Sequence, residues 1–190
     1  MEKKKSKIKG ISKEIEIPKS IEVKVEENKL IVKSSLGSLE KEFPFKLEVK
    51  NGKIVISTDK STRREGKILG TGEAHIRNMF FGLQKPFEYK LQICSVHFPV
   101  TAAVSLDKKF LTIKNFLGES IERKAKLMDN VEVEVEKDII TVRSADKEAA
   151  GQTAANIEKI AKVKNKDRRI FQDGIFIIEK PGKKILWFRR

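Results

Sequence analysis

The chain has 190 residues, of which 39% are hydrophobic, and its 41 Lys and Arg outnumber its 27 Asp and Glu, giving a formal charge of +14. This composition suffices for one or two small cores, and so much positive charge is typical of proteins with a polyanionic partner, although acidic proteins and anionic membranes would also suit it. No stretch reaches the roughly 20 apolar residues of a membrane-spanning helix, and no apolar segment follows the basic start as it would in a secretory signal. The single Cys94 suits a reducing compartment.

The positive charge is concentrated at the two ends of the chain. Residues 1–13 carry a net charge of +5, residues 164–190 carry +6, and everything between them carries only +3. A nearly balanced body with basic ends suits a protein that folds alone and then contacts nucleic-acid phosphates. For the N-terminal run, a merely solvated terminus fits the sequence equally well.

Four strands and a helix are expected in the first half. Apolar and polar residues alternate at the period of a half-buried strand in two segments, and each is followed, after a turn, by a short apolar run. The expected strands are residues 21–25, 30–32, 43–49 and 54–56. Asn51-Gly52 predicts a tight hairpin before the last strand, since both residue types tolerate a positive φ. A helix is expected near residues 60–81.

The second half repeats this pattern, with strands expected at 131–135 and 139–142 and a helix near 146–162. Three pairs of landmarks share one offset of 81 residues: Ile17-Pro18 with Phe98-Pro99, Leu36-Gly37 with Leu117-Gly118, and Gly70 with Gly151. A constant offset predicts an internal duplication.

Gly70 and Gly151 fall inside the expected helices, where glycine costs about 1 kcal/mol relative to alanine. Both are expected to permit a close approach of helix and sheet. Each half is therefore expected to be an α+β domain, an antiparallel-rich sheet covered on one face by one helix. The predicted organisation is a basic N-terminal extension at 1–13, a first domain at 14–85, a second domain at 86–180 and a basic C-terminal tail at 181–190.

No catalytic constellation is apparent, so no enzymatic activity, cofactor or metal is predicted. His75 and His97 have no Cys or His at zinc-ligand spacing and are expected to be packed or RNA-facing. Cys94 lies in an apolar strand and is expected to be a buried, inert thiol. The glycines at 66–72 lack the residue order of a phosphate-binding loop.

Clustered cations, aromatic residues and a glycine occur together in residues 162–178. Arg can bind a phosphate with two hydrogen bonds and Lys adds a point charge, while Gly174 is expected to permit a tight turn close to a partner. Alternatively, residues 176–178 form a last strand and the cations are merely solvated, or Asp167 or Asp173 holds an arginine in an internal ion pair.

From Ile15 to about Gly182, the sequence resembles the universal large-subunit ribosomal proteins of the L-six family, called L-nine in eukaryotic naming. The residues that carry the resemblance are Ile15-Glu16-Ile17-Pro18, Leu36-Gly37-Ser38-Leu39, the run at 152–157 and, above all, the run at 166–175. The last run is similar to the archaeal and eukaryotic branch. The N-terminal Lys run and the Trp187–Arg190 ending match no motif of the family.

The resemblance implies two tandem copies of one α+β domain in a structural constituent of the large ribosomal subunit. It implies binding to ribosomal RNA near the sarcin–ricin loop and the stalk base, where translational GTPases dock, with neighbouring large-subunit proteins as further partners. It also implies a cytoplasmic location on the ribosome, no membrane partner, and assembly in the nucleolus if the source is eukaryotic. The implied rRNA contacts are Lys164, Lys166, Arg168, Arg169, Lys183 and Lys184.

The alternative interpretation is a free-standing basic adaptor that binds nucleic acid or protein outside the ribosome. Sedimentation with large subunits would distinguish the two interpretations. A hydrolase is disfavoured by the missing acid–base pair.

Overall fold

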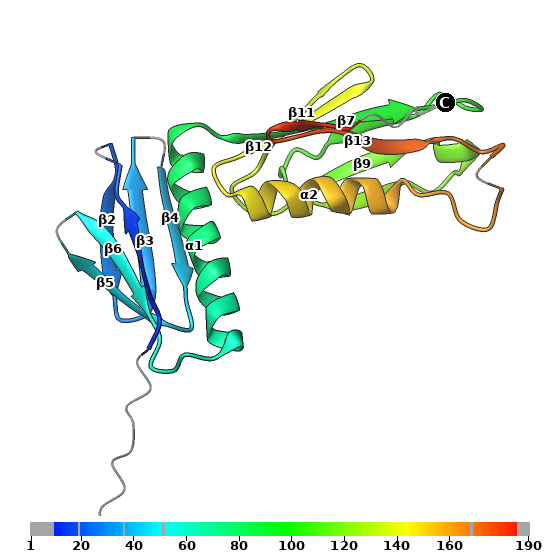
Figure 1. Ribbon diagram of the computed structural model, residues 1–190. Helices are drawn as coiled ribbons and strands as arrows, with labels where there is room; N and C mark the ends of the chain where they lie inside the picture. The colour runs from blue at the N-terminus through cyan, green and yellow to red at the C-terminus, as the bar shows by residue number, and fades with distance from the viewer. Residues whose placement is uncertain (1–9, 19, 36, 51, 168, 186–190) are drawn as a thin grey trace, which may run out of the picture. The chain divides into compact units, whose positions relative to one another are not determined.

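The computed structural model describes residues 10–18, 20–35, 37–50, 52–167 and 169–185 (Figure 1). The chain divides into two compact units, unit 1 at residues 1–85 and unit 2 at residues 86–190. No helix in the described ranges is long and apolar enough to cross a membrane.

Unit 1 contains two three-stranded antiparallel sheets and one helix, with strand orders β1-β6-β5 and β2-β3-β4. Its elements are β1 (Ser12–Glu16), β2 (Glu22–Glu26), β3 (Lys29–Ser34), β4 (Gly37–Glu42), β5 (Lys46–Lys50), β6 (Lys53–Ser57) and α1 (Arg63–Gln84). Alternation along β3 and β6 leaves Leu30, Val32, Ile54 and Ile56 fully buried. Helix α1 begins after Thr62, whose hydroxyl accepts a hydrogen bond from the Glu65 N–H.

Unit 2 has the same kind of architecture with a larger second sheet. Its strand orders are β10-β9-β8 and β11-β12-β7-β13-β14. Its elements are β7 (Phe87–Cys94), β8 (Thr101–Val104), β9 (Phe110–Lys114), a 3₁₀ turn (Phe116–Gly118), β10 (Arg123–Lys126), β11 (Glu132–Glu136), β12 (Ile139–Ser144), α2 (Lys147–Ile160), β13 (Gly174–Lys180) and β14 (Lys183–Lys184). Helix α2 packs through Ala150, Ala154 and Ile157 against both sheets.

The two units have one strand order, which confirms the predicted pair of similar α+β domains. The order β1-β6-β5 in unit 1 becomes β7-β12-β11 in unit 2, and β2-β3-β4 becomes β8-β9-β10. Each unit contains two sheets, however, where the sequence analysis expected one. Unit 2 also has two strands without a counterpart, β13 and β14, because the chain continues after α2 and returns along β7.

The glycine that brings helix and sheet together in unit 1 is Gly72, so the prediction for Gly70 was wrong. A Cβ at Gly70 would meet nothing within 4 Å, whereas a Cβ at Gly72 would lie 2.2 Å from the buried Phe45 ring. In unit 2 the prediction for Gly151 is confirmed, since its Cβ would lie 3.0 Å from the Tyr89 hydroxyl. The packing glycines are therefore Gly72 and Gly151. The offset of 81 residues relates Gly151 to Gly70 instead.

Three further details of the structure differ from what the sequence predicts. Ser12 and Lys13 belong to β1, so the first sheet begins inside the segment predicted as an extension. Lys183 and Lys184 form β14 and pair with the end of β13. Gly174 is the first residue of β13 rather than part of a turn, and a Cβ there would lie 2.8 Å from the Phe176 ring and 3.4 Å from the Ala161 carbonyl oxygen.

Candidate nucleic-acid interface

The predicted rRNA contacts lie in two places on unit 2. Lys164, Lys166 and Arg169 are exposed on the α2–β13 loop, residues 161–173, whereas Arg168 lies outside the described residues. Lys183 and Lys184 are exposed on β14, at the other end of β13 (Figure 1). Seven residues of strand separate the two groups by about 20 Å, at roughly 3.3 Å per residue. The structure therefore divides the predicted contacts between two ends of one strand.

The α2–β13 loop ends on a buried carboxylate. Asp173 is only 3% exposed, and its Oδ1 accepts hydrogen bonds from the backbone N–H groups of Val96 (2.7 Å) and His97 (3.0 Å). Its Oδ2 lies 2.6 Å from His97 Nδ1. Burial acts to raise the pKa of Asp173, but the hydrogen bonds from His97 and Val96 outweigh it and hold the pKa below its usual value. This contact fixes the loop to the segment that follows β7.

An aromatic contact joins the same two segments. The His97 and Phe171 rings are stacked with their centroids 4.7 Å apart, and the Lys166 Nζ lies 4.5 Å from the Phe171 centroid. His97 is therefore held by contacts within unit 2, although the residue remains exposed. Lys166 is held over a ring yet keeps its charge exposed, as is usual for a cation–π pair at a surface.

Arg123 on β10 stabilises the beginning of the loop. Its guanidinium donates to the carbonyl oxygens of Ile160 (2.7 Å) and Lys162 (3.2 Å), where α2 ends and its carbonyl groups need donors. Two further N–H groups bind the Glu119 carboxylate at 2.7 and 2.6 Å. Hydrogen bonds from Arg123 outweigh burial and lower the pKa of Glu119. Arg123 thus has a structural role.

Neither acid of the loop pairs with the Arg169 side chain. Asp173 is occupied by His97 and Val96, and Asp167 Oδ1 accepts the backbone N–H of Arg169 at 2.9 Å. Within the described part of the chain, nothing bonds to the Arg169 guanidinium, which disfavours the internal ion pair considered above for this arginine. Its charge remains available to an external partner.

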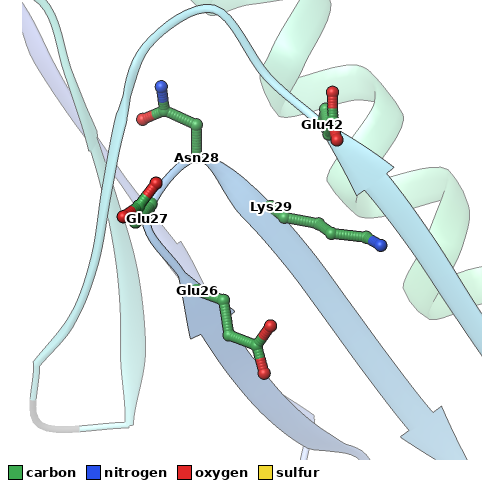
Figure 2. Close-up of a pocket in the computed structure, with 5 residues that line it drawn as sticks. All are labelled: Glu26, Glu27, Asn28, Lys29 and Glu42. Carbon is green, nitrogen blue, oxygen red and sulfur yellow. The ribbon is translucent and has the colours of Figure 1, made fainter.

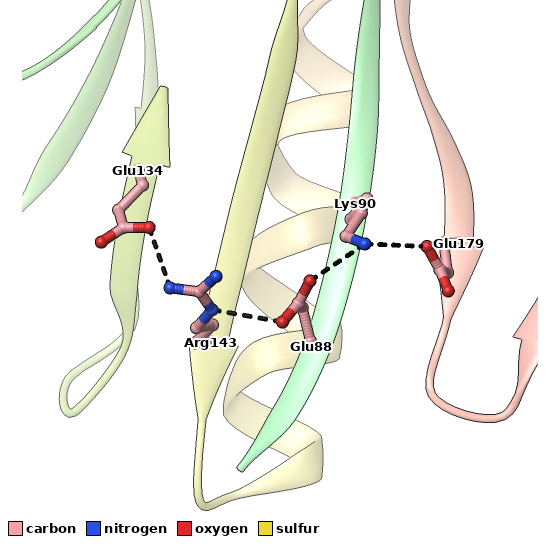
Figure 3. Close-up of polar contacts among 5 residues, drawn as sticks. All are labelled: Glu88, Lys90, Glu134, Arg143 and Glu179. Atoms are coloured by element: carbon pink, nitrogen blue, oxygen red, sulfur yellow. Dashed lines mark hydrogen bonds and ion pairs between the residues drawn. The ribbon is translucent and has the colours of Figure 1, made fainter. Parts of the chain in front are cut away.

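Cations on the outer face of the large sheet are arranged differently. Arg143 bonds to Glu134 (2.9 Å) and Glu88 (3.2 Å), and Lys90 bonds to Glu88 and Glu179, both at 3.2 Å (Figure 3). Hydrogen bonds to Glu179 and Glu88 raise the pKa of Lys90. Three carboxylates balance two cations along this row, so the face has no excess of positive charge for a phosphate.

A pocket beside the β2–β3 hairpin of unit 1 has the wrong charge for nucleic acid. It is lined by Glu26, Glu27, Asn28, Lys29 and Glu42 (Figure 2). Three carboxylates around one ammonium group repel phosphate. This pocket is therefore no part of the candidate interface.

The other residues considered for chemistry have structural surroundings. Cys94 is partly buried, and burial raises the pKa of its thiol, which disfavours a reactive thiolate. His75 Nδ1 lies 3.2 Å from Lys41 Nζ on the surface of α1. Among the described residues, no group of three or more His, Cys, Asp or Glu is placed to hold a metal ion.

Sequence comparison agrees with the resemblance. The profile of the family described as Ribosomal protein L6 matches residues 98–174, which include β8 to α2 and the whole α2–β13 loop. The large ribosomal subunit protein uL6 of Methanococcus vannielii is 42% identical over 176 residues, covering 91% of this chain and 96% of the relative. The uL6 proteins of Staphylothermus marinus (42% over 178 residues, 91% and 96%) and Methanosarcina mazei (38% over 176 residues, 91% and 99%) are similarly close.

Similarity at this level over nearly the whole length of both chains excludes a shared motif on unrelated proteins. It also agrees with the two-domain α+β fold. The chain therefore belongs to the L6 family of ribosomal proteins and is a structural, non-enzymatic component of the large ribosomal subunit, with ribosomal RNA and other ribosomal proteins as its partners.

Proposed function

We propose that unit 2 attaches the protein to large-subunit rRNA through the cations of its α2–β13 loop, with β14 as a second contact. The proposed contacts are Lys164, Lys166, Arg168 and Arg169 in the loop and Lys183 and Lys184 on β14. The observation that carries the proposal is a contrast: the described loop cations have no carboxylate partner among the described residues, whereas Lys90 and Arg143 on the sheet are paired. Phosphate contacts supply most of the affinity of such a surface.

The rigidity of the described loop supports this proposal. Asp173, Phe171 and Arg123 fix its end, its middle and its beginning, so binding does not have to order the whole segment. Ile170 in the loop is 62% exposed, and Phe98, which follows the His97 that binds Asp173, is 48% exposed. The Phe98 ring can stack on an unpaired base, which RNA recognition often uses.

We further propose that this attachment lies in the factor-binding region, near the sarcin–ricin loop and the stalk base, where translational GTPases dock. The family resemblance of the run at 166–175 supports the location. It would make the protein a support for the rRNA that these factors contact, on cytoplasmic ribosomes.

The location can be tested by directed hydroxyl-radical probing of assembled large subunits. A cleavage reagent would be attached at Arg169→Cys in a Cys94→Ser background, with Lys90→Cys on the sheet face as the matched control. We expect cleavage from position 169 to concentrate in and beside the sarcin–ricin loop and cleavage from position 90 to be weak there. Strong cleavage elsewhere from position 169, with none in this region, would contradict the proposed location.

A further inference from the structure

Unit 1 carries a cluster of exposed cations at the beginning of α1. We name Lys60, Arg63, Arg64 and Lys67 the α1 basic cluster; all four side chains are exposed. Within the part of the chain that the structure describes, no ion pair or hydrogen bond joins any of these side chains to a carboxylate. The nearby acids are engaged elsewhere, since Asp59 bonds to Lys46 at 2.8 Å and Glu65 caps the helix with Thr62.

Several other cations of unit 1 have carboxylate partners. Glu73 on α1 binds both Lys13 (2.7 Å) and Arg77 (2.6 Å), and these cations lower its pKa against the effect of burial. Lys53 binds Glu14 at 3.2 Å across two strands of one sheet. The α1 basic cluster thus differs from these paired cations in the same way as the α2–β13 loop differs from the paired cations of the large sheet.

Folding does not explain the cluster. Arg63 and Arg64 occupy the first turn of α1, where the helix dipole disfavours positive charge and where acidic residues are usual. Arg63 and Lys67 are four residues apart and lie on one face, so they repel each other. These cations destabilise the helix that carries them. We therefore expect them to interact with a negatively charged partner outside the protein.

The described part of the chain begins close to the α1 basic cluster. The Thr58 N–H donates to the Ile11 carbonyl at 3.1 Å, and the Ile11 Cδ1 lies 3.9 Å from the position of a Cβ on Gly66 in α1. The described chain therefore begins at Gly10 beside α1, directly after five lysines at positions 3, 4, 5, 7 and 9.

We infer that the α1 basic cluster is a second RNA-binding surface of this protein, independent of the one on unit 2. The expected ligand is the phosphate backbone of large-subunit rRNA. Clustered Lys and Arg without a base-sized aromatic surface suit phosphate contacts that hold the protein in place, not contacts that select a sequence.

The test compares two full-length triple variants that lose equal charge from unit 1. The first is Arg63→Gln, Arg64→Gln and Lys67→Gln, and the control is Lys46→Gln, Lys50→Gln and Lys53→Gln, whose ammonium groups pair with Asp59, Glu48 and Glu14. Binding to deproteinised large-subunit rRNA would be measured over a series of KCl concentrations. Each lost phosphate contact reduces the log–log slope by about 0.7–0.9, so we expect a slope shallower by about 2 for the first variant and nearly unchanged for the control.

Equal slopes for the two variants would overturn the inference. Wild-type RNA binding by the first variant, combined with poor incorporation into large subunits, would overturn it in favour of a protein partner. An Arg63→Lys, Arg64→Lys variant keeps the charge and is expected to keep the wild-type slope; a slope like that of the Gln variant would also contradict the inference. A Lys164→Gln, Lys166→Gln, Arg169→Gln variant tests the unit 2 proposal separately, because either surface can fail while the other is retained.

Discussion

The two units have the same strand order, yet only unit 2 has strands beyond the repeated pattern. Strand β1 is the edge of its sheet, whereas its counterpart β7 pairs with β12 on one side and β13 on the other. The α2–β13 loop exists only because the chain continues past α2 and returns to this edge. The proposed rRNA-binding loop is therefore an addition to the duplicated domain and not part of it.

Particular residues fix this loop to the rest of unit 2. Asp173 binds a segment 76 residues earlier in the chain, and Arg123 binds the carbonyl groups that end α2. Within the described residues, α1 has no arginine in the equivalent role at its end. This difference between the units leads to four predictions about stability, in decreasing order of expected effect.

Asp173→Ala is expected to have the largest effect. It removes three hydrogen bonds from a buried carboxylate and leaves two backbone N–H groups without their acceptor, which we expect to cost about 3 kcal/mol. The free energy of unfolding would be measured by urea denaturation. The matched control is Asp167→Ala in the same loop, whose exposed carboxylate should cost less than about 1 kcal/mol. Equal losses for the two variants would show that the buried contact does not hold the loop.

Gly72→Leu and Gly151→Leu compare helix packing in the two units. Overpacking should cost about 1–3 kcal/mol in either unit, with the greater loss at Gly72, where an added Cβ would lie 2.2 Å from the buried Phe45 ring. At Gly151 the nearest atom is the Tyr89 hydroxyl at 3.0 Å. Melting temperatures would rank the two variants, and an unchanged value at Gly72 would contradict the packing described for unit 1.

The Asp173 contact should also weaken in acid. Because the pKa of Asp173 is lower in the folded than in the unfolded protein, its stabilisation is complete above about pH 4 and is lost as the pH falls further. The wild type should therefore lose its stability advantage over Asp173→Asn during acid titration. An advantage that stays constant down to about pH 2 would show that the carboxylate charge is not the source of the stabilisation.

Gly70→Ala is expected to have the smallest effect and the opposite sign. Nothing lies within 4 Å of the new methyl group, so the higher helix propensity of alanine should stabilise unit 1 by up to about 1 kcal/mol. Together with Gly72→Leu, it separates a helix glycine that packs from one that does not. A loss of stability at Gly70 would mean that this position is crowded after all.

Period-two alternation predicted β2 and β11, short apolar runs after turns predicted β3, β6 and β12, and the repeat of these patterns predicted the two-domain fold. It could not predict β1, where Ile15 is the only buried side chain, or β4, which has no fully buried side chain. Those strands are specified by their neighbours, since β1 pairs with β6 and β4 pairs with β3. Sequence spacing likewise placed the wrong glycine against the sheet of unit 1, because which residue of α1 faces Phe45 depends on where the helix begins.

The candidate interface was predictable in composition but not in arrangement. The run at 166–175 identified the cations, yet their division between the two ends of β13 depends on the strand that separates them. The contact between His97 and Asp173 joins residues that no local pattern relates. The α1 basic cluster went unnoticed in the sequence, because the acids around it made the body of the chain appear balanced until their partners were known.

The most direct test of the account is whether the cations of the α2–β13 loop, and not total charge, attach the protein to the large subunit. Tagged chains carrying Arg168→Ala with Arg169→Ala, or Lys90→Ala with Arg143→Ala, lose equal charge from unit 2, but the second pair is bound to carboxylates on the sheet face. Co-sedimentation with large subunits in sucrose gradients would be compared after both variants are shown to be folded. We predict that the loop variant is depleted from large subunits and that the sheet variant incorporates as the wild type does. Equal incorporation of both folded variants would contradict the account.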